Sequence, residues 1–202
     1  ADKYIAADEL LTRIEGVSYL LLGEKHDNPD HHALQLRALD HVLQTDNVSA
    51  VSFEMMSSEQ QPLLLDLSLS PQSSLEQINE YLQWDDDGWN WDYYGPLLYR
   101  VIQADVLINA ANISNEEMMQ VYGAPTAAEI EGVLDEQTMV ALEKDIDDSH
   151  CGMLPESQFS AMVRVQQARD FAMASSLALD TEQQLQVLVA GNYHIRRDLG
   201  VP

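Results

Sequence analysis

Two glycine-led turns hold the residues of this chain that are best suited to chemistry. Each has the pattern Gly-x-x-His and follows a short apolar run; the first ends at His26 and the second at His194. Glu54 follows a third apolar run. Two imidazoles and a carboxylate can hold a divalent metal ion that keeps open positions for water. They can also perform acid–base chemistry without a metal, because imidazole titrates near neutral pH.

Four apolar runs predict the strands that position these side chains. The predicted strands span about residues 18–22, 48–53, 106–110 and 186–190. Strands that alternate with helices predict an α/β fold, with a mainly parallel sheet and helices on both faces. Residues just beyond the C-terminal ends of parallel strands lie at one edge of the sheet. We therefore expect the two histidines and Glu54 to meet at that edge.

Apolar residues at helical spacing predict the helices between these strands. The predicted helices span residues 28–44, 57–70, 74–82, 97–103, 115–121, 127–133, 135–147 and 156–179. We expect a single domain over residues 1–202, with residues 113–150 as a helical insertion over the strand ends. Residues 84–96 contain all three tryptophans and are predicted to form a loop, either packed on the core or walling a ligand pocket.

Composition excludes several classes of function. The formal net charge of the 202 residues is -24, which would repel a nucleic-acid backbone and disfavours an anionic membrane surface. No apolar run approaches the roughly 20 residues that a membrane span needs. Cys151 is the single cysteine, so no disulfide can form within the chain, and it is predicted to be a packed thiol. His31, His32 and His41 are predicted to lie at the surface.

Several longer motifs resemble those of the ChaN-like family of haem-binding, iron-regulated bacterial lipoproteins. They are G-E-K-H-D-N at 23–28, S-F-E-M at 52–55, H-C-G-M-L-P at 150–155 and G-N-Y-H-x-R-R-D-L-G-V-P at 191–202. The resemblance covers about residues 15–202. It implies an α/β fold, a haem pocket shared by two subunits and a lipid anchor at the periplasmic face of the outer membrane. A homodimer formed on haem binding and an outer-membrane haem receptor are the implied partners.

The resemblance also implies which residues hold the haem. A tyrosine is expected to bind the iron, and Tyr193 and Tyr94 are the leading candidates. Lys25 is the first candidate for the haem propionates, with Arg196 and Arg197 behind it, and His150 is expected to line the site. The lipid-bearing cysteine of the family is absent, as in a trimmed chain.

Three hypotheses for function follow. The first is a haem-binding protein of bacterial iron acquisition that holds haem at a dimer interface. The second is a metal-dependent hydrolase, protease- or esterase-like. It rests on a resemblance to the wider group of erythromycin esterases and Tiki-type metalloproteases, whose working residues map onto His26, Glu54 and His194. The third is a scaffold whose site has decayed. The sequence does not identify the physiological ligand or decide whether the chain is an enzyme.

Overall fold

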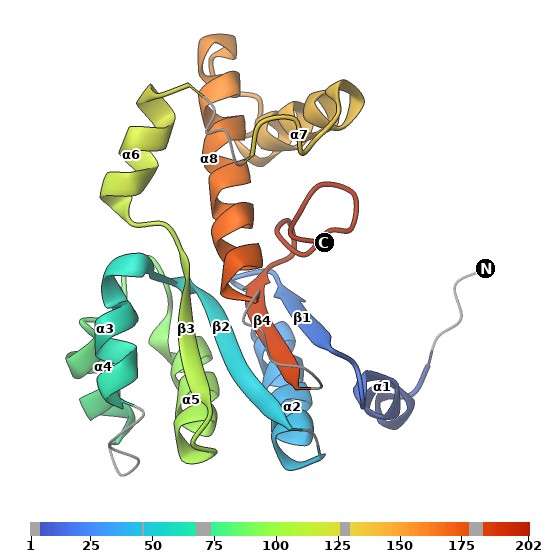
Figure 1. Ribbon diagram of the computed structural model, residues 1–202, viewed down its shortest axis with the longest axis vertical. Coiled ribbons are helices and arrows are strands. Elements are labelled where there is room, and N and C mark those ends of the chain that lie inside the picture. The colour runs from blue at the N-terminus through green and yellow to red at the C-terminus, as the bar shows by residue number, and fades with distance from the viewer. Residues whose placement is uncertain (1–4, 46, 68–73, 126–129, 178–183) are drawn as a thin grey trace.

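The protein has an α/β fold built on one four-stranded sheet. The computed structural model describes residues 5–45, 47–67, 74–125, 130–177 and 184–202 (Figure 1). The strands lie in the order β1-β4-β2-β3, and all neighbouring strands are parallel. Their bounds are β1 (Tyr19–Glu24), β2 (Val48–Ser57), β3 (Leu107–Asn112) and β4 (Leu185–Gly191). The predicted parallel sheet is therefore confirmed.

Helices connect the strands and extend beyond them. Within the described residues they are α1 (Ala7–Ile14), α2 (Pro29–Thr45), the 3-10 helix η1 (Ser58–Gln60), α3 (Gln61–Leu67), α4 (Leu75–Leu82), α5 (Trp91–Gln103), α6 (Asn115–Gly123), α7 (Glu136–Ser149) and α8 (Glu156–Ser176). None of these helices is both long and apolar enough to cross a membrane, as far as the chain is described.

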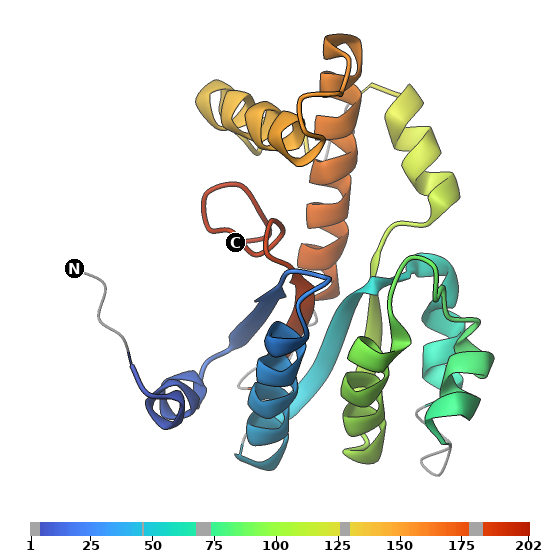
Figure 2. The ribbon, with the colours of Figure 1, turned by 180° about the vertical axis from the view of Figure 1, so that it is seen from behind.

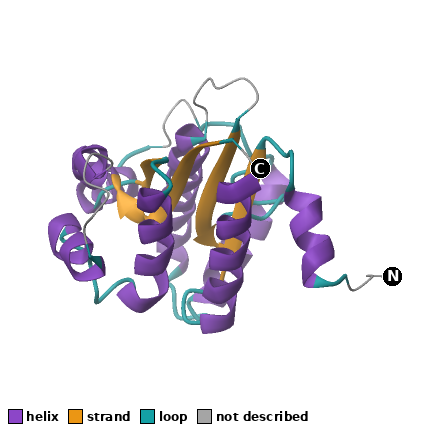
Figure 3. Ribbon diagram, turned by 90° about the horizontal axis from the view of Figure 1, so that it is seen from below, coloured by secondary structure: helices purple, strands orange, loops and turns teal. Residues whose placement is uncertain are grey.

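Both faces of the sheet are covered by helices, as Figures 2 and 3 show. Helices α2 and α5 pack on one face, where the largest apolar cluster includes Leu39, Val51 and Leu98. The C-terminal part of α8 packs on the other face, where Met173 contacts the cluster that contains Leu188. The central strands β2 and β4 are buried along almost their whole length, as expected for near-continuous apolar runs in a parallel sheet.

Helices α6 and α7 and the N-terminal part of α8 stand beyond the C-terminal ends of the strands (Figure 1). Their own apolar cluster joins α7 to α8 through Leu142, Ile146 and Val163, and it includes Leu199 from the C-terminal segment. This arrangement places a helical wall over the edge of the sheet at which the predicted site residues lie.

The structure differs from the local predictions in three places. Residues 91–96 are not part of a loop, because α5 begins at Trp91 with Asn90 as its N-cap. Pro96 inside that helix removes one hydrogen bond, and the burial of Tyr94, Leu97 and Leu98 offsets the loss. No helix was predicted where α1 forms. The predicted helix 127–133 lies partly outside the described residues, and its last four residues form turns and a bend.

Two predictions of side-chain exposure were also wrong. His32 is buried, since its ring stacks on Tyr93 and its Nε2 lies 3.1 Å from the carbonyl oxygen of His26. Cys151, predicted as a packed thiol, is exposed in the loop between α7 and α8. Tyr93, which covers the His32 ring, comes from another helix, so hydropathy along the chain did not identify the burial of His32.

Candidate functional site

The two Gly-x-x-His turns meet at the C-terminal edge of the sheet. Glu24 at the end of β1 lies opposite Gly191 at the end of β4 in the strand register. A Cβ on Gly191 would lie 2.9 Å from Cε1 of His26, so the bare glycine leaves the space that the imidazole occupies. The first turn therefore packs directly on the second, which explains why glycine, with no side chain, is needed at position 191.

His194 is held between two carboxylates from different elements. Its Nε2 lies 3.3 Å from Oε1 of Glu54, on β2, and its Nδ1 lies 2.6 Å from Oδ1 of Asp170, on α8. Burial lowers the pKa of this imidazole, but the hydrogen bonds and charges of the two carboxylates outweigh burial and raise the pKa to about 9. At neutral pH His194 is thus an imidazolium that holds α8 against the sheet.

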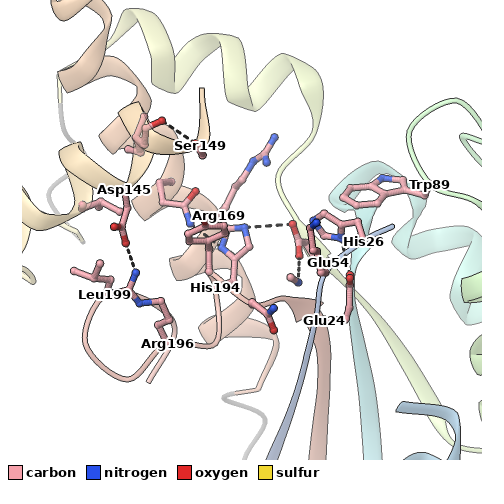
Figure 4. Close-up of a pocket in the computed structure, with 17 residues that line it drawn as sticks. Glu24, His26, Glu54, Trp89, Asp145, Ser149, Arg169, His194, Arg196 and Leu199 are labelled. Atoms are coloured by element: carbon pink, nitrogen blue, oxygen red, sulfur yellow. Dashed lines mark hydrogen bonds and ion pairs between the residues drawn. The ribbon is translucent and has the colours of Figure 1, made fainter. Parts of the chain in front are cut away.

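Glu54 is ionised although it is buried. Burial raises its pKa, but the hydrogen bond and charge of His194 and the Gly191 amide, which donates to Oε2 at 2.7 Å, together lower the pKa below its usual value. Asp170 behaves differently, because burial raises its pKa more than His194 lowers it. Figure 4 shows Glu54 between the two histidines.

A second buried network surrounds Glu24. Its Oε1 accepts a hydrogen bond from the Tyr94 hydroxyl at 3.0 Å and lies 2.5 Å from Nδ1 of His26. Burial lowers the pKa of His26, but the hydrogen bond and charge of Glu24 outweigh it and raise the pKa. Burial and the charge of Glu24 raise the pKa of the Tyr94 hydroxyl, which therefore stays protonated.

A cavity of about 240 Å³ lies above these networks, between the sheet edge and the helical wall (Figure 4). One side is polar, with Glu54, His26 and His194. The opposite side is apolar and is formed by Leu142, Ile146 and Leu199, from α7 and the C-terminal segment. Such a mixture of apolar wall and convergent polar groups is typical of a small-molecule site.

The residues predicted to bind a cofactor fall into two groups. Lys25, Tyr193 and Arg196 line the cavity, and Tyr193 is 55% exposed. Tyr94 does not line it, because its hydroxyl is buried against Glu24. His150 caps the end of α7 beyond the cavity lining, and its Nδ1 lies 2.7 Å from the carbonyl oxygen of Ile146.

The position of Tyr94 argues against it as an iron ligand. Ferric iron prefers a tyrosinate, and a buried hydroxyl beside a carboxylate resists deprotonation. Among the described tyrosines, Tyr193 is the one that lines the cavity.

Several residues of the site were missed at the sequence level. Glu24 was placed at the strand exit but was given no role, and Asp170, Gln166 and Arg169 lie on α8, far from either turn in the sequence. A signal existed, because Gln166, Arg169 and Asp170 recur at three- and four-residue spacing and so share one face of a helix. The pattern did not reveal that this face meets His194.

The metal role predicted for His26, Glu54 and His194 stays a prediction. No group of three His, Cys, Asp or Glu side chains among the described residues is placed to hold a metal ion. His194 directs one nitrogen at each of two carboxylates. The hydrolase hypothesis therefore stays a prediction.

The segment that carries His194 closes on itself tightly, and this gives a first testable prediction. A Cβ on Gly200 would lie 2.2 Å from the carbonyl oxygen of His194, which also accepts a hydrogen bond from Val201. Because the obstacle is backbone, we expect Gly200→Ala to lower the free energy of unfolding by about 2 kcal/mol. Urea denaturation measures the loss.

Gly123→Ala is the matched control for this substitution. Gly123 ends α6, and a Cβ there would meet nothing within 4 Å. We expect a change of less than about 0.5 kcal/mol. Equal stability of the two variants would show that the segment after His194 is not packed as described.

Known proteins resemble this chain in sequence and in fold. The family described as "Haem-binding uptake, Tiki superfamily, ChaN" matches residues 10–202. No curated protein matches the sequence. A solved structure, "Cofacial heme binding to ChaN of Campylobacter jejuni", is similar at a TM-score of 0.86 and 25% identity, over 99% of this chain and 80% of that one.

Two more distant structures share the fold. The RRSP effector domain of a MARTX toxin from Vibrio vulnificus CMCP6 is similar at a TM-score of 0.56 and 14% identity, over 98% of this chain and 34% of that one. The type III effector HopBA1 is similar at a TM-score of 0.52 and 11% identity, over 96% of this chain and 78% of that one.

Proposed function

We propose that this chain, which belongs to the haem-binding uptake, Tiki superfamily, ChaN family, binds haem in the cavity at the C-terminal edge of its sheet. The observation that carries the proposal is the half-exposed phenol of Tyr193, which lines that cavity beside His194 and opposite an apolar wall. Tyrosinate is a sound ligand for ferric iron, and apolar side chains suit the porphyrin faces.

The residues present fit this group. Tyr193 would hold the iron, Leu142 and Ile146 would contact the macrocycle, and Lys25 is an exposed cation for the propionates. When bound, haem would supply iron-centred chemistry at Tyr193. The burial of apolar porphyrin surface would provide most of the affinity, and iron ligation would provide the selectivity for haem.

The size of the cavity supports a second part of the proposal, that a second copy of the chain helps to enclose each bound haem. The cavity holds about 240 Å³, which is less than the roughly 300–1,000 Å³ of sites that enclose a drug-sized ligand. A porphyrin seated on Tyr193 would therefore extend past the rim. We propose that a second copy of this chain covers that exposed part, in line with the cofacial haem binding of the Campylobacter jejuni protein.

A hemin titration tests the proposal. We expect addition of hemin to produce a saturable shift of the Soret band at one hemin per chain, and we expect the sedimenting mass to double as hemin is added. Hemin in buffer alone is the blank, because free hemin self-associates. A Soret band identical to the blank would overturn haem binding, whereas saturable binding without a change of mass would overturn only the shared site.

Elemental analysis of the same preparation separates the hydrolase hypothesis from this one. Bound manganese, cobalt or zinc, with peptidase or esterase activity that His26→Ala abolishes, would favour the enzyme. The lipid anchor, the outer-membrane setting and the haem receptor implied by the resemblance stay predictions.

A further inference from the structure

Three cationic side chains line the cavity, and they differ in whether a carboxylate already neutralises them. Arg196 pairs with both Asp145 and Asp198. Lys25 is exposed and lies 3.6 Å from Asp27. Arg169 forms no ion pair with any residue that the structure describes. In a chain of net charge -24, an unpaired arginine inside a cavity is a feature that needs an explanation.

The guanidinium of Arg169 is poorly satisfied as a hydrogen-bond donor. It offers five N–H groups. The one acceptor within reach among the described residues is the sulfur of Met118, 3.6 Å from Nη2, and sulfur is a weak acceptor. The Nε atom is sealed from solvent and has no partner in that part of the chain. Buried donors without acceptors are rare, because each one loses the hydrogen bonds that water would provide.

Arg169 lies where the haem cavity meets a second one. The second cavity holds about 630 Å³ and is bounded by the end of β2, the loop before α5 and the start of α6. Glu54, Trp89 and Arg169 line both cavities. Figure 4 shows the Arg169 side chain above the Glu54–His194 pair.

The surroundings restrict an anion to the neighbourhood of Arg169. Exposed Glu59 and Asp85 line the second cavity but not the first, and they would repel a carboxylate. Glu54 lines both cavities, and its carboxylate is already occupied by the Gly191 amide and by His194. Asp170, the next residue on α8, is directed at His194 instead of Arg169.

We propose that Arg169 is a binding residue for a carboxylate of the ligand. An arginine fork matches a carboxylate in shape and can donate two parallel hydrogen bonds to it. This inference rests on the proposed function, since in haem the carboxylate is one of the two propionates. It adds Arg169 to the propionate contacts implied for Lys25 and Arg196, and it gives the junction of the two cavities a role in ligand orientation.

Esterified porphyrin tests the inference. Hemin and hemin dimethyl ester are titrated into the wild-type protein and into Arg169→Gln, with the same detergent present throughout. We expect the wild type to bind hemin about tenfold more tightly than the ester, and Arg169→Gln to weaken hemin binding about tenfold while leaving ester binding unchanged. The two changes should not add, because both remove the same contact.

Arg37→Gln is the control for simple loss of charge. Arg37 is exposed on α2, pairs with Asp8 and does not line either cavity. It should leave the preference for hemin over the ester intact. If Arg169→Gln kept the full wild-type preference, the inference would be overturned while haem binding stood. If the wild type bound neither porphyrin, the proposed function would fail, and this inference with it.

Discussion

Tyr193→Phe is expected to weaken hemin binding by about 100-fold or more and to abolish the spectral features of a ferric tyrosinate. Loss of an outer hydrogen-bond partner of a metal ligand costs about 10–100-fold in affinity, and loss of the ligand itself should cost at least as much. Tyr193 is 55% exposed, so stability should change by less than about 0.5 kcal/mol. Absorbance titration and thermal unfolding measure the two quantities.

Two other tyrosines make this result interpretable. Tyr19 is also 55% exposed, but it lies at the opposite end of β1 and does not line the cavity, so Tyr19→Phe should bind hemin normally. Tyr94→Phe removes the hydroxyl that donates to Glu24, and we expect a loss of about 1 kcal/mol in stability with little change in hemin affinity. The assignment of Tyr193 would be wrong if Tyr94→Phe lost hemin binding and Tyr193→Phe kept it.

The strands and turns that form this site could be predicted from the sequence, because they follow from the pattern of neighbouring residues. The runs that became β1, β2 and β4 are apolar and short, and a polar residue follows each one. Parallel strands bring such exits to one edge, so the meeting of the two turns near Glu54 could be anticipated. The register confirms it, since Glu24 lies opposite Gly191.

The electrostatics of the site could not be anticipated in the same way. They depend on α8, whose apolar pattern predicts a helix but not which side faces the strand ends. Asp170 meets His194 because α8 runs on beyond the sheet edge, while Met173 and Leu177 pack on the sheet near Leu188. The same long-range packing buries Tyr94 against Glu24. Its hydroxyl therefore donates to that carboxylate, and Tyr94 does not line the cavity.

The contacts of His194 predict how stability depends on pH. Its pKa is about 9 in the folded protein and about 6.5 in the unfolded chain, so the folded state binds the proton more tightly. The stabilisation is therefore fully present below about pH 6.5 and is lost as pH rises through about 9. A difference of about 2.5 pKa units corresponds to about 3 kcal/mol of unfolding free energy.

Other charged groups also affect how the stability of the protein depends on pH. The pKa of His26 is also raised, so His26 adds to the loss of stability on the alkaline side. The pKa of Glu54 is lowered, so Glu54 stays ionised throughout this range and keeps attracting His194. A protein of net charge -24 is further weakened at high pH by general repulsion, and variants are needed to isolate the His194 contribution.

We expect urea denaturation to show that the free energy of unfolding of the wild type falls by about 3 kcal/mol between about pH 6 and about pH 10. The fall in His194→Gln should be much smaller. The loss of unfolding free energy in Asp170→Asn should be intermediate, because this substitution removes one of the two carboxylates that raise the pKa of His194. His41 lies near the C-terminal end of α2, away from the site, and its ring pairs with Glu15, so the stability of His41→Gln should depend on pH as that of the wild type does. A fall in His194→Gln as large as that of the wild type would mean that general repulsion is the cause. A fall confined to proteins that keep His194 and Asp170 would show that this imidazolium links α8 to the sheet, and thereby fixes the wall of the haem cavity.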